Sequence, residues 1–261
     1  MRIALCHINT VSGEPGGNAG RILDAYRTAG ERGADLVVMP ELAVAGYPPR
    51  DLLGRTEFLE ACAEATREVA AASGAAGLLF GTAQANPGQG KGAFNSAILA
   101  SEGRVLATVN KRLLPTYDVF DEGRYFEADA SPATTIRFGG LSLGIHICED
   151  AWNEEGFWPR RLYARDPVAE LADAGAQLLL NLSASPFHRE KRELRRTMFS
   201  RHARRHGIPF LYTNLVGGND ELIFDGDAFA FGADGELIAT SLPFREGMLL
   251  VEAHPGNPVT L

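Results

Sequence analysis

Short apolar runs recur along the chain and alternate with stretches in which apolar residues recur at helical spacing. The first pattern is typical of buried strands and the second of amphipathic helices. We expect strands at residues 3–8, 36–39, 78–82, 97–100, 105–109, 141–147, 178–182 and 210–216, followed by short strands joined by an ADGE turn within 221–241. We expect helices at residues 18–33, 56–73, 166–175 and 190–206. Alternating strands and helices predict a layered α/β fold, but the pattern does not fix the number of layers or sheets.

Three polar residues are expected to cap these helices. Asn18 lies in a glycine-rich stretch at residues 12–21, and Thr56 stands before an apolar helical face. Asp166 precedes Pro167, which is typical of a helix start because the carboxylate caps the helix and proline fits its first turn. The glycine-rich stretch lacks the GK[ST] ending of a phosphate-binding loop and the setting of a dinucleotide site, so we expect a turn there.

Every second residue from Leu141 to Ile147 is a large aliphatic one, which predicts a strand with one buried face. The strand stops abruptly at Cys148. A thiol at the tip of a buried strand can be held in a tight turn and exposed to a cleft, as a nucleophile requires. The alternative is a structural cysteine, because free cysteine is among the most buried residue types.

Composition restricts the class of protein. The 261 residues, 45% of them hydrophobic, are enough to bury a sizeable core, and no linker divides the chain, so we expect one domain over residues 1–261. The net charge of −8 argues against nucleic acid or an anionic membrane as a partner. The three cysteines lie far apart and suggest neither disulfides nor a zinc site. With no signal peptide and no apolar run of roughly 18 residues, we expect a cytoplasmic protein.

Three ionisable residues follow three of the apolar runs. Glu41, Lys111 and Cys148 each stand just beyond a predicted strand, where layered α/β sheets bind their ligands. Together they suit acyl transfer: a thiolate attacks, a carboxylate carries the proton, and an ammonium stabilises the thiolate and the oxyanion. The backbone N–H of Glu149 is expected to be a second oxyanion donor. The alternatives are a solvated loop acid for Glu41 and a surface charge for Lys111.

Five stretches carry a resemblance to a known family. They are PELAVAGYPPRDLL at 40–53, NKRLLPTYDVFDEGRYF at 110–126, HICEDAW at 146–152, LNLSASPF at 180–187 and VGGNDELIFDG at 216–226. In these motifs and their order the chain resembles the carbon–nitrogen hydrolase (nitrilase) superfamily, and most closely the glutamine-hydrolysing domain of glutamine-dependent NAD synthetase. The resemblance implies a four-layer α-β-β-α sandwich and an enzyme that needs no metal or cofactor.

The resemblance also implies which residues form the catalytic set. Cys148 corresponds to the nucleophile, Glu41 to the general base and acid, and Lys111 to the oxyanion stabiliser. Glu122 corresponds to the family's second glutamate, which supports the lysine and helps to place the hydrolytic water.

Substrate contacts follow from the same resemblance. Tyr117 and Ser185 correspond to glutamine-binding positions, and Lys191 to a basic residue that meets the substrate carboxylate. Tyr47 and Phe120 are expected to form walls of the pocket. Lys191 also lies in HREKRELRR, so a solvated position on a charged helix is the alternative for it.

The expected function is therefore release of ammonia from the side-chain amide of glutamine through a thioester on Cys148, feeding NAD synthesis. A first alternative is an amidase or nitrilase-type hydrolase that acts on another small ω-amide, a carbamoyl compound or a nitrile. A second, from another class, is a non-catalytic partner subunit. An intact Glu41, Lys111 and Cys148 set argues against the second, because a non-catalytic subunit does not need all three.

The resemblance stops short of a full synthetase. The chain lacks the SGGxDS phosphate loop of the ATP-using domain, so we expect a stand-alone amidase, a separate glutaminase subunit that works with an NAD synthetase subunit, or a piece of a longer protein. We also expect a homo-oligomer, because the superfamily commonly assembles through dimers.

Overall fold

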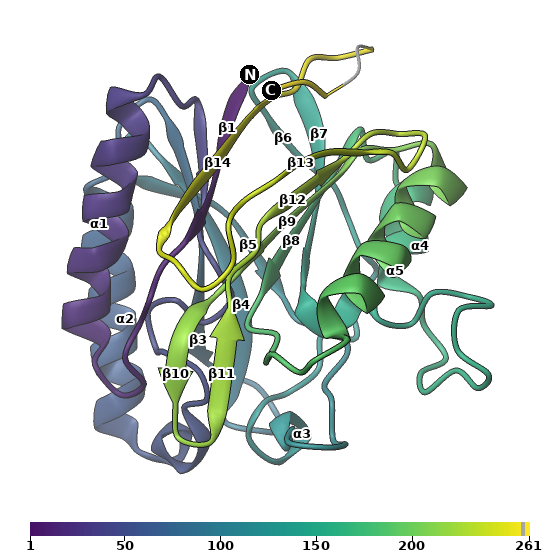
Figure 1. The fold of residues 1–261 in the computed structure, drawn as a ribbon. Coiled ribbons are helices and arrows are strands. Elements are labelled where there is room, and N and C mark those ends of the chain that lie inside the picture. The colour runs from purple at the N-terminus through teal and green to yellow at the C-terminus, as the bar shows by residue number, and fades with distance from the viewer. Residues whose placement is uncertain (257–258) are drawn as a thin grey trace.

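Two six-stranded sheets pack face to face in a computed structural model that describes residues 1–256 and 259–261 (Figure 1). The first sheet contains β1 (Arg2–His7), β2 (Leu36–Val38), β3 (Gly77–Ala85), β4 (Ala93–Ser101), β5 (Arg104–Asn110) and β14 (Gly247–Glu252), in the order β14-β1-β2-β3-β4-β5. The second contains β6 (Ile136–Phe138), β7 (Leu141–Ile147), β8 (Leu178–Ser183), β9 (Phe210–Asn214), β12 (Phe229–Phe231) and β13 (Leu237–Thr240), in the order β13-β12-β9-β8-β7-β6.

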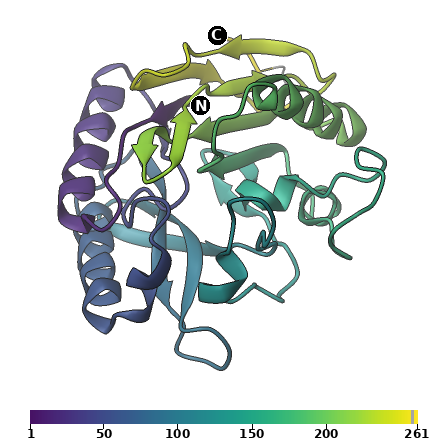
Figure 2. The same ribbon diagram turned by 60° about the horizontal axis from the view of Figure 1, so that its bottom comes forward.

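Helices cover the outer face of each sheet. The first sheet is covered by α1 (Pro15–Glu31) and α2 (Thr56–Ala71), and the second by α4 (Pro167–Asp173) and α5 (Lys191–His206) (Figures 1 and 2). The short helices α3 (Glu122–Tyr125), η1 (Arg50–Gly54) and η2 (Cys148–Ala151) complete the helices, and β10 (Val216–Asn219) and β11 (Leu222–Asp225) form a separate hairpin. The layers therefore follow the order α-β-β-α. Among the described residues no helix combines the length and apolarity needed to cross a membrane.

Alternation along each strand distributes side chains between the layers. In β1, Ile3 and Leu5 lie in the core between the sheets, whereas Ala4 and Cys6 lie in the core beneath α1 and α2. Each fully buried aliphatic side chain of this kind contributes about 1.5–3 kcal/mol through the hydrophobic effect. Because both faces of the inner strands are buried, their sequences are nearly continuous apolar runs.

The strand β7 is buried on both faces, not on one as the alternation predicts. Leu143 and Ile145 lie in the core between the sheets. On the opposite face, Gly144 allows Ala176 and Leu179 to approach closely, since a Cβ at this position would lie 3.0 Å from Ala176 Cβ and 2.9 Å from Leu179 Cδ2. A small residue on the second face marks close packing here, where the pattern suggested exposure.

The expected capping role of Asn18 is wrong. The helix α1 begins at Pro15, whose fixed φ suits the first helical turn, so Asn18 lies inside the helix. Its buried amide accepts from Val11 N at 2.9 Å and donates to Val44 O at 2.9 Å. Asn18 therefore holds the neighbouring loops against the helix instead of capping it.

The other helix starts differ in outcome. Thr56 is the first residue of α2 and makes no capping hydrogen bond, so its expected role is also wrong. The Asp166 carboxylate accepts from Ala169 N at 3.1 Å and confirms the predicted start of α4. The pattern does not predict β6 or β14, each of which forms one edge of its sheet.

Candidate active site

Glu41 reaches the site through a turn that passes over β3. The backbone of Gly81 in β3 donates to Pro40 O at 3.1 Å and accepts from Val44 N at 3.0 Å. A Cβ at Gly81 would lie 2.3 Å from Leu42 N, so only glycine permits this close approach. The turn thereby carries Glu41 sideways from the end of β2, over β3, towards β4.

This crossing lets Glu41 meet Lys111, although their strands are not neighbours. The strands β2 and β5 are separated by β3 and β4, which corresponds to about 14 Å at ordinary strand spacing. Nevertheless the Lys111 ammonium donates to Glu41 Oε1 at 2.6 Å. Asn95 of β4 joins the two residues: its side chain donates to Glu41 Oε1 at 2.7 Å, and its carbonyl accepts from Lys111 N at 2.8 Å.

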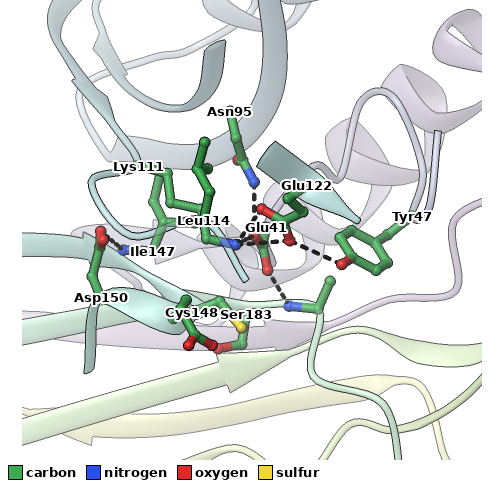
Figure 3. Close-up of polar contacts among 12 residues, drawn as sticks. Glu41, Tyr47, Asn95, Lys111, Leu114, Glu122, Ile147, Cys148, Asp150 and Ser183 are labelled. Atoms are coloured by element: carbon green, nitrogen blue, oxygen red, sulfur yellow. Dashed lines mark hydrogen bonds and ion pairs between the residues drawn. The ribbon is translucent and has the colours of Figure 1, made fainter. Parts of the chain in front are cut away.

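The second sheet contributes the other contact of this carboxylate. Ala184 N, just beyond β8, donates to Glu41 Oε2 at 2.7 Å. Both carboxylate oxygens are thus held, one by each half of the sandwich (Figure 3). Glu41 is 1% exposed and Lys111 is fully buried, so the alternatives of a solvated acid and a surface lysine do not describe them.

Glu122, the first residue of α3, completes the group around the ammonium. Lys111 Nζ donates to Glu122 Oε1 at 2.9 Å and Oε2 at 2.7 Å, and the Tyr47 hydroxyl donates to Glu122 Oε1 at 2.9 Å. Burial raises the pKa of Glu122 and the Glu41 charge adds to this effect, while Lys111 and Tyr47 oppose it. Burial alone would lower the pKa of Lys111, but Glu122 and Glu41 outweigh it and hold that pKa well above the ordinary value. The lysine is therefore a permanent ammonium.

Cys148 lies at a strained turn directly after β7. Its φ of 41° belongs to the left-handed region, which a residue with a Cβ occupies at a cost of about 1–3 kcal/mol. Asp150 holds the turn: Oδ2 accepts from Ile147 N at 3.0 Å, and Oδ1 accepts from Arg112 N at 2.9 Å and Leu113 N at 2.8 Å. One buried carboxylate thus fastens the cysteine turn to the segment that follows Lys111.

The surroundings of the Cys148 thiol favour its protonated form. Burial raises its pKa, Glu41, Glu122 and Glu149 raise it further, and only Lys111 among the main contributors lowers it. These interactions also place Cys148 within electrostatic reach of Glu41 and Lys111, beside which its side chain lies in Figure 3. Lys111 favours the thiolate, but burial and the three carboxylates oppose it. A base must remove the proton, and the Glu41 carboxylate is the adjacent candidate.

Cys148 opens into a cavity of about 400 Å³. Four of the expected substrate-binding residues border it, namely Tyr117, Phe120, Ser185 and Lys191, and so does Glu149. Tyr47 differs from expectation: it lies behind Glu122 and borders a neighbouring cavity of about 270 Å³. Its hydroxyl supports Glu122 and does not form a wall of the cavity beside Cys148.

The side chain of Glu149 supplies a negative charge at this cavity. Its carboxylate accepts from the Tyr117 hydroxyl and from the Tyr163 hydroxyl, each at 2.9 Å. Burial raises the pKa of Glu149 to about 7, while Lys111 and the two tyrosines act in the opposite direction. The sequence points only to the backbone N–H of Glu149. The structure adds its carboxylate, whose pKa lies near neutral pH.

Lys191 supplies a positive charge to the same cavity. It is the first residue of α5, 8% exposed, and it forms no ion pair with any residue of the described chain. Its ammonium lies 5.4 Å from the ring centre of Phe120 and 5.3 Å from that of Trp152, within cation–π range. Burial lowers its pKa. An ammonium at a helix N-terminus is unfavourable with the helix dipole, so this position favours an anionic ligand.

Ser185 adds a neutral polar group to the cavity wall. Its backbone N donates to Asn214 Oδ1 at 2.7 Å, and Asn214 Nδ2 donates back to Ser185 O at 3.1 Å. The Ser185 hydroxyl is buried and has no partner within the described residues. A buried hydroxyl without a partner costs about 1–3 kcal/mol, so this side chain also favours a polar ligand.

Sequence reasoning missed three residues that organise the site: Asn95, Asp150 and Tyr163. Asp150 stands within the motif at 146–152, and Asn95 lies just before the predicted strand at 97–100, but their importance comes from contacts across 38 and 54 residues of chain. Tyr163 lies in a loop without periodicity, where no sequence signal distinguishes it. The available signal was a buried polar residue in an otherwise apolar strand, which applies to Asn95 alone.

Comparison with known proteins agrees with this geometry. The family model described as carbon-nitrogen hydrolase matches residues 2–256, and the chain belongs to that family. It is therefore a hydrolase of carbon–nitrogen bonds other than peptide bonds. Its four-layer fold confirms the architecture expected from the resemblance.

Individual relatives point to two kinds of protein. The chain is 42% identical over 254 residues to the glutamine-dependent NAD(+) synthetase of Synechocystis sp., in an alignment that covers 95% of this chain and 45% of that protein. The structure of glutamine-dependent NAD+ synthetase from Acinetobacter baumannii in complex with ADP superposes with a TM-score of 0.89 at 29% identity, covering 99% of this chain and 47% of the other. The chain thus spans less than half the length of the curated relatives that it matches.

The second kind is a stand-alone amidase. An amidase from Nesterenkonia sp. AN1 has a TM-score of 0.82 and 27% identity, over 98% of this chain and 94% of that one. The structure shows a mutant of that amidase after Michael addition of acrylamide at its active-site cysteine. An active-site cysteine that reacts with a small amide-bearing electrophile is thus present in a protein of this fold.

Proposed function

We propose that this chain hydrolyses the side-chain amide of glutamine, with Cys148 as the nucleophile, and releases ammonia and glutamate. The observation that carries the proposal is the pair of opposite charges, Glu149 and Lys191, in the cavity that contains the thiol. Glutamine has an α-ammonium and an α-carboxylate, which these two side chains would satisfy. The similarity to glutamine-dependent NAD synthetases supports the same substrate.

In the first half of the proposed reaction, Glu41 takes the proton of Cys148 as the sulfur attacks the side-chain amide carbon. The resulting oxyanion is stabilised by the Lys111 ammonium and the backbone N–H of Glu149. Protonated Glu41 then gives its proton to the departing nitrogen, which leaves as ammonia. The C–N bond breaks and a glutamyl thioester remains on the sulfur.

The second half repeats the same proton transfers with water. Glu41, ionised again, takes a proton from a water molecule that attacks the thioester carbon, and Glu122 helps to place that water. Collapse of the second tetrahedral intermediate breaks the C–S bond, and Glu41 returns its proton to the sulfur. Glutamate leaves and the resting thiol is restored, so one carboxylate acts alternately as base and acid.

Trapping the thioester tests the proposal. Rapid acid quenching followed by mass spectrometry should find a glutamyl adduct on the peptide that contains Cys148, and acrylamide should label the same residue. Cys148→Ser should lower ammonia release from glutamine by on the order of 10³-fold or more, because an alkoxide forms far less readily than a thiolate. Cys62→Ser is the matched control, since Cys62 is buried on the inner face of α2 away from the cavity. Near-full activity in Cys148→Ser would rule out this mechanism.

A panel of primary amides separates glutamine from the other amides that the same catalytic set can hydrolyse. The proposal predicts the highest kcat/KM for glutamine, and a higher value for an uncharged amide such as propionamide would favour the amidase alternative.

We further propose that the ammonia feeds NAD synthesis. Support comes from the relatives' own names, and the test is NAD formation from glutamine when an ammonia-dependent NAD synthetase is added. The homo-oligomer and the partner subunit that the resemblance implies remain predictions, and light scattering would test both.

A further inference from the structure

Two tyrosines from different segments hold the carboxylate of Glu149. Tyr117 lies within 2.9 Å of both carboxylate oxygens, and it borders the cavity. Tyr163 belongs to the loop between η2 and α4 and donates to Oε1 alone, also at 2.9 Å. Each hydroxyl has one proton, so Tyr163 occupies Oε1 while Tyr117 can donate to either oxygen.

Tyr163 approaches Glu149 from outside the cavity. Its hydroxyl also lies 3.3 Å from Leu114 O, but the closer and charged Glu149 oxygen is the stronger acceptor. Asn153 fixes the backbone beneath it, since Asn153 Nδ2 donates to Tyr163 O at 2.9 Å. Tyr163 is not among the residues that border the cavity, so any effect on a ligand must pass through Glu149.

We infer that Tyr163 is a positioning residue for recognition of the substrate's α-ammonium: by donating to Oε1 it fixes the orientation of the Glu149 carboxylate, so that the remaining acceptor sites of the carboxylate are directed at the ligand. This inference rests on the proposed function and specifies which feature of the substrate Glu149 recognises. It makes Tyr163 a determinant of specificity and not of bond cleavage.

The electrostatic surroundings of Glu149 predict how binding of the substrate's α-amino group depends on pH. The charged and titratable groups that face it are Tyr117, Tyr163, Lys111, Glu122, Cys148 and Lys191. Burial raises the pKa of Glu149 to about 7, and the hydrogen bond from Tyr163 is one of the interactions that lower it. Removing that hydroxyl therefore raises the pKa further. Protonated Glu149 is neutral and cannot pair with an ammonium, so binding of the α-amino group weakens as the pH falls through this value.

The test compares Tyr163→Phe with wild type on two substrates that differ only in the α-amino group, L-glutamine and 4-carbamoylbutanoate. Tyr163→Phe should raise KM for glutamine about tenfold near pH 7 and leave kcat within about twofold, since one hydrogen bond to a charged group is lost. The pH midpoint at which KM for glutamine rises should move upward by about one pH unit. KM for 4-carbamoylbutanoate should not change. Tyr26→Phe is the matched control, because its hydroxyl donates at 2.7 Å to Ala76 O near the outer helices.

A double-mutant cycle makes the inference independent of any general loosening of the fold. Glu149→Gln should abolish the preference for glutamine over 4-carbamoylbutanoate, and adding Tyr163→Phe to it should raise KM for glutamine no further. An additive effect, or an equal rise in KM for both substrates, would overturn the role of Tyr163 while leaving the proposed function intact. A wild type that hydrolyses 4-carbamoylbutanoate but not glutamine would instead overturn the proposed function, and the role of Tyr163 with it.

Discussion

Lys111→Met removes the ammonium that bonds the buried carboxylates of Glu41 and Glu122. In the described structure Lys111 Nζ donates to Glu41 at 2.6 Å and to Glu122 at 2.7 and 2.9 Å, and the lysine is fully buried. Methionine fills a similar volume but has no charge. The variant leaves Glu41 and Glu122 side by side in the interior without a compensating cation.

The loss of folding stability in Lys111→Met follows from burial of the two carboxylates and depends on pH. Breaking a buried ion pair by removing one partner costs about 3–5 kcal/mol, so Lys111→Met should lose that much stability near neutral pH. Burial and Glu41 already raise the pKa of Glu122 above its ordinary value of 4.5, and loss of Lys111 raises it further. A proton that the folded state retains and the unfolded state releases makes stability fall as the pH rises. The slope is about 1.4 kcal/mol per pH unit for one carboxylate, from about pH 4.5 up to the raised pKa.

Urea unfolding measures the effect. The difference in unfolding free energy between wild type and Lys111→Met should be several kcal/mol smaller at about pH 5 than at about pH 8. Adding Glu122→Gln to the variant removes one of the two like charges and should restore most of the stability and flatten the pH dependence. Equal destabilisation at both pH values, or no recovery in the double variant, would refute the electrostatic account of this cluster.

Three further changes test the geometry around the site. Asn95→Leu removes a donor to Glu41 in a buried setting and should lower kcat by about 10–100-fold, with circular dichroism unchanged, because a base that is less well held transfers protons less efficiently. Gly81→Ala would place a Cβ 2.3 Å from Leu42 N, and should lower kcat more than the same substitution at the open, helical Gly20, as steady-state assays of both variants will show. Asp166→Ala should lower the free energy of unfolding by about 0.5–2 kcal/mol through loss of a helix cap, and an unchanged urea midpoint would contradict that role.

The sequence points to the candidate catalytic side chains but not to the path by which they meet. Glu41, Lys111 and Cys148 stand out because a charged or nucleophilic residue ends an otherwise apolar run. Their convergence depends on the turn over Gly81, which carries Glu41 across β3 towards β4. A glycine inside a strand pattern indicates close backbone approach, but the pattern does not say which segment approaches.

The surroundings of the candidate substrate-binding residues are harder to predict, for a different reason. Lys191 lies on a helix of which nearly every exposed position is charged, so its burial against Phe120 and Trp152 has no signal in the helical periodicity. The sequence points to the backbone N–H of Glu149, because its position after the candidate nucleophile is a local property. The role of its carboxylate depends on two tyrosines that lie 32 and 14 residues away in the chain.

The hydrogen bonds of Lys111 also give Tyr47 a place in the proposed mechanism. An ammonium has three protons, and the three contacts to Glu41 and Glu122 use all of them. To stabilise an oxyanion, Lys111 must therefore release one of these contacts. Releasing one bond to Glu122 costs less than releasing the bond to Glu41. Glu122 keeps a second bond to the lysine, and its Oε1 still accepts from Tyr47. Tyr47 thus lies outside the substrate cavity and still supports the reaction, since it satisfies the carboxylate that the lysine partly leaves.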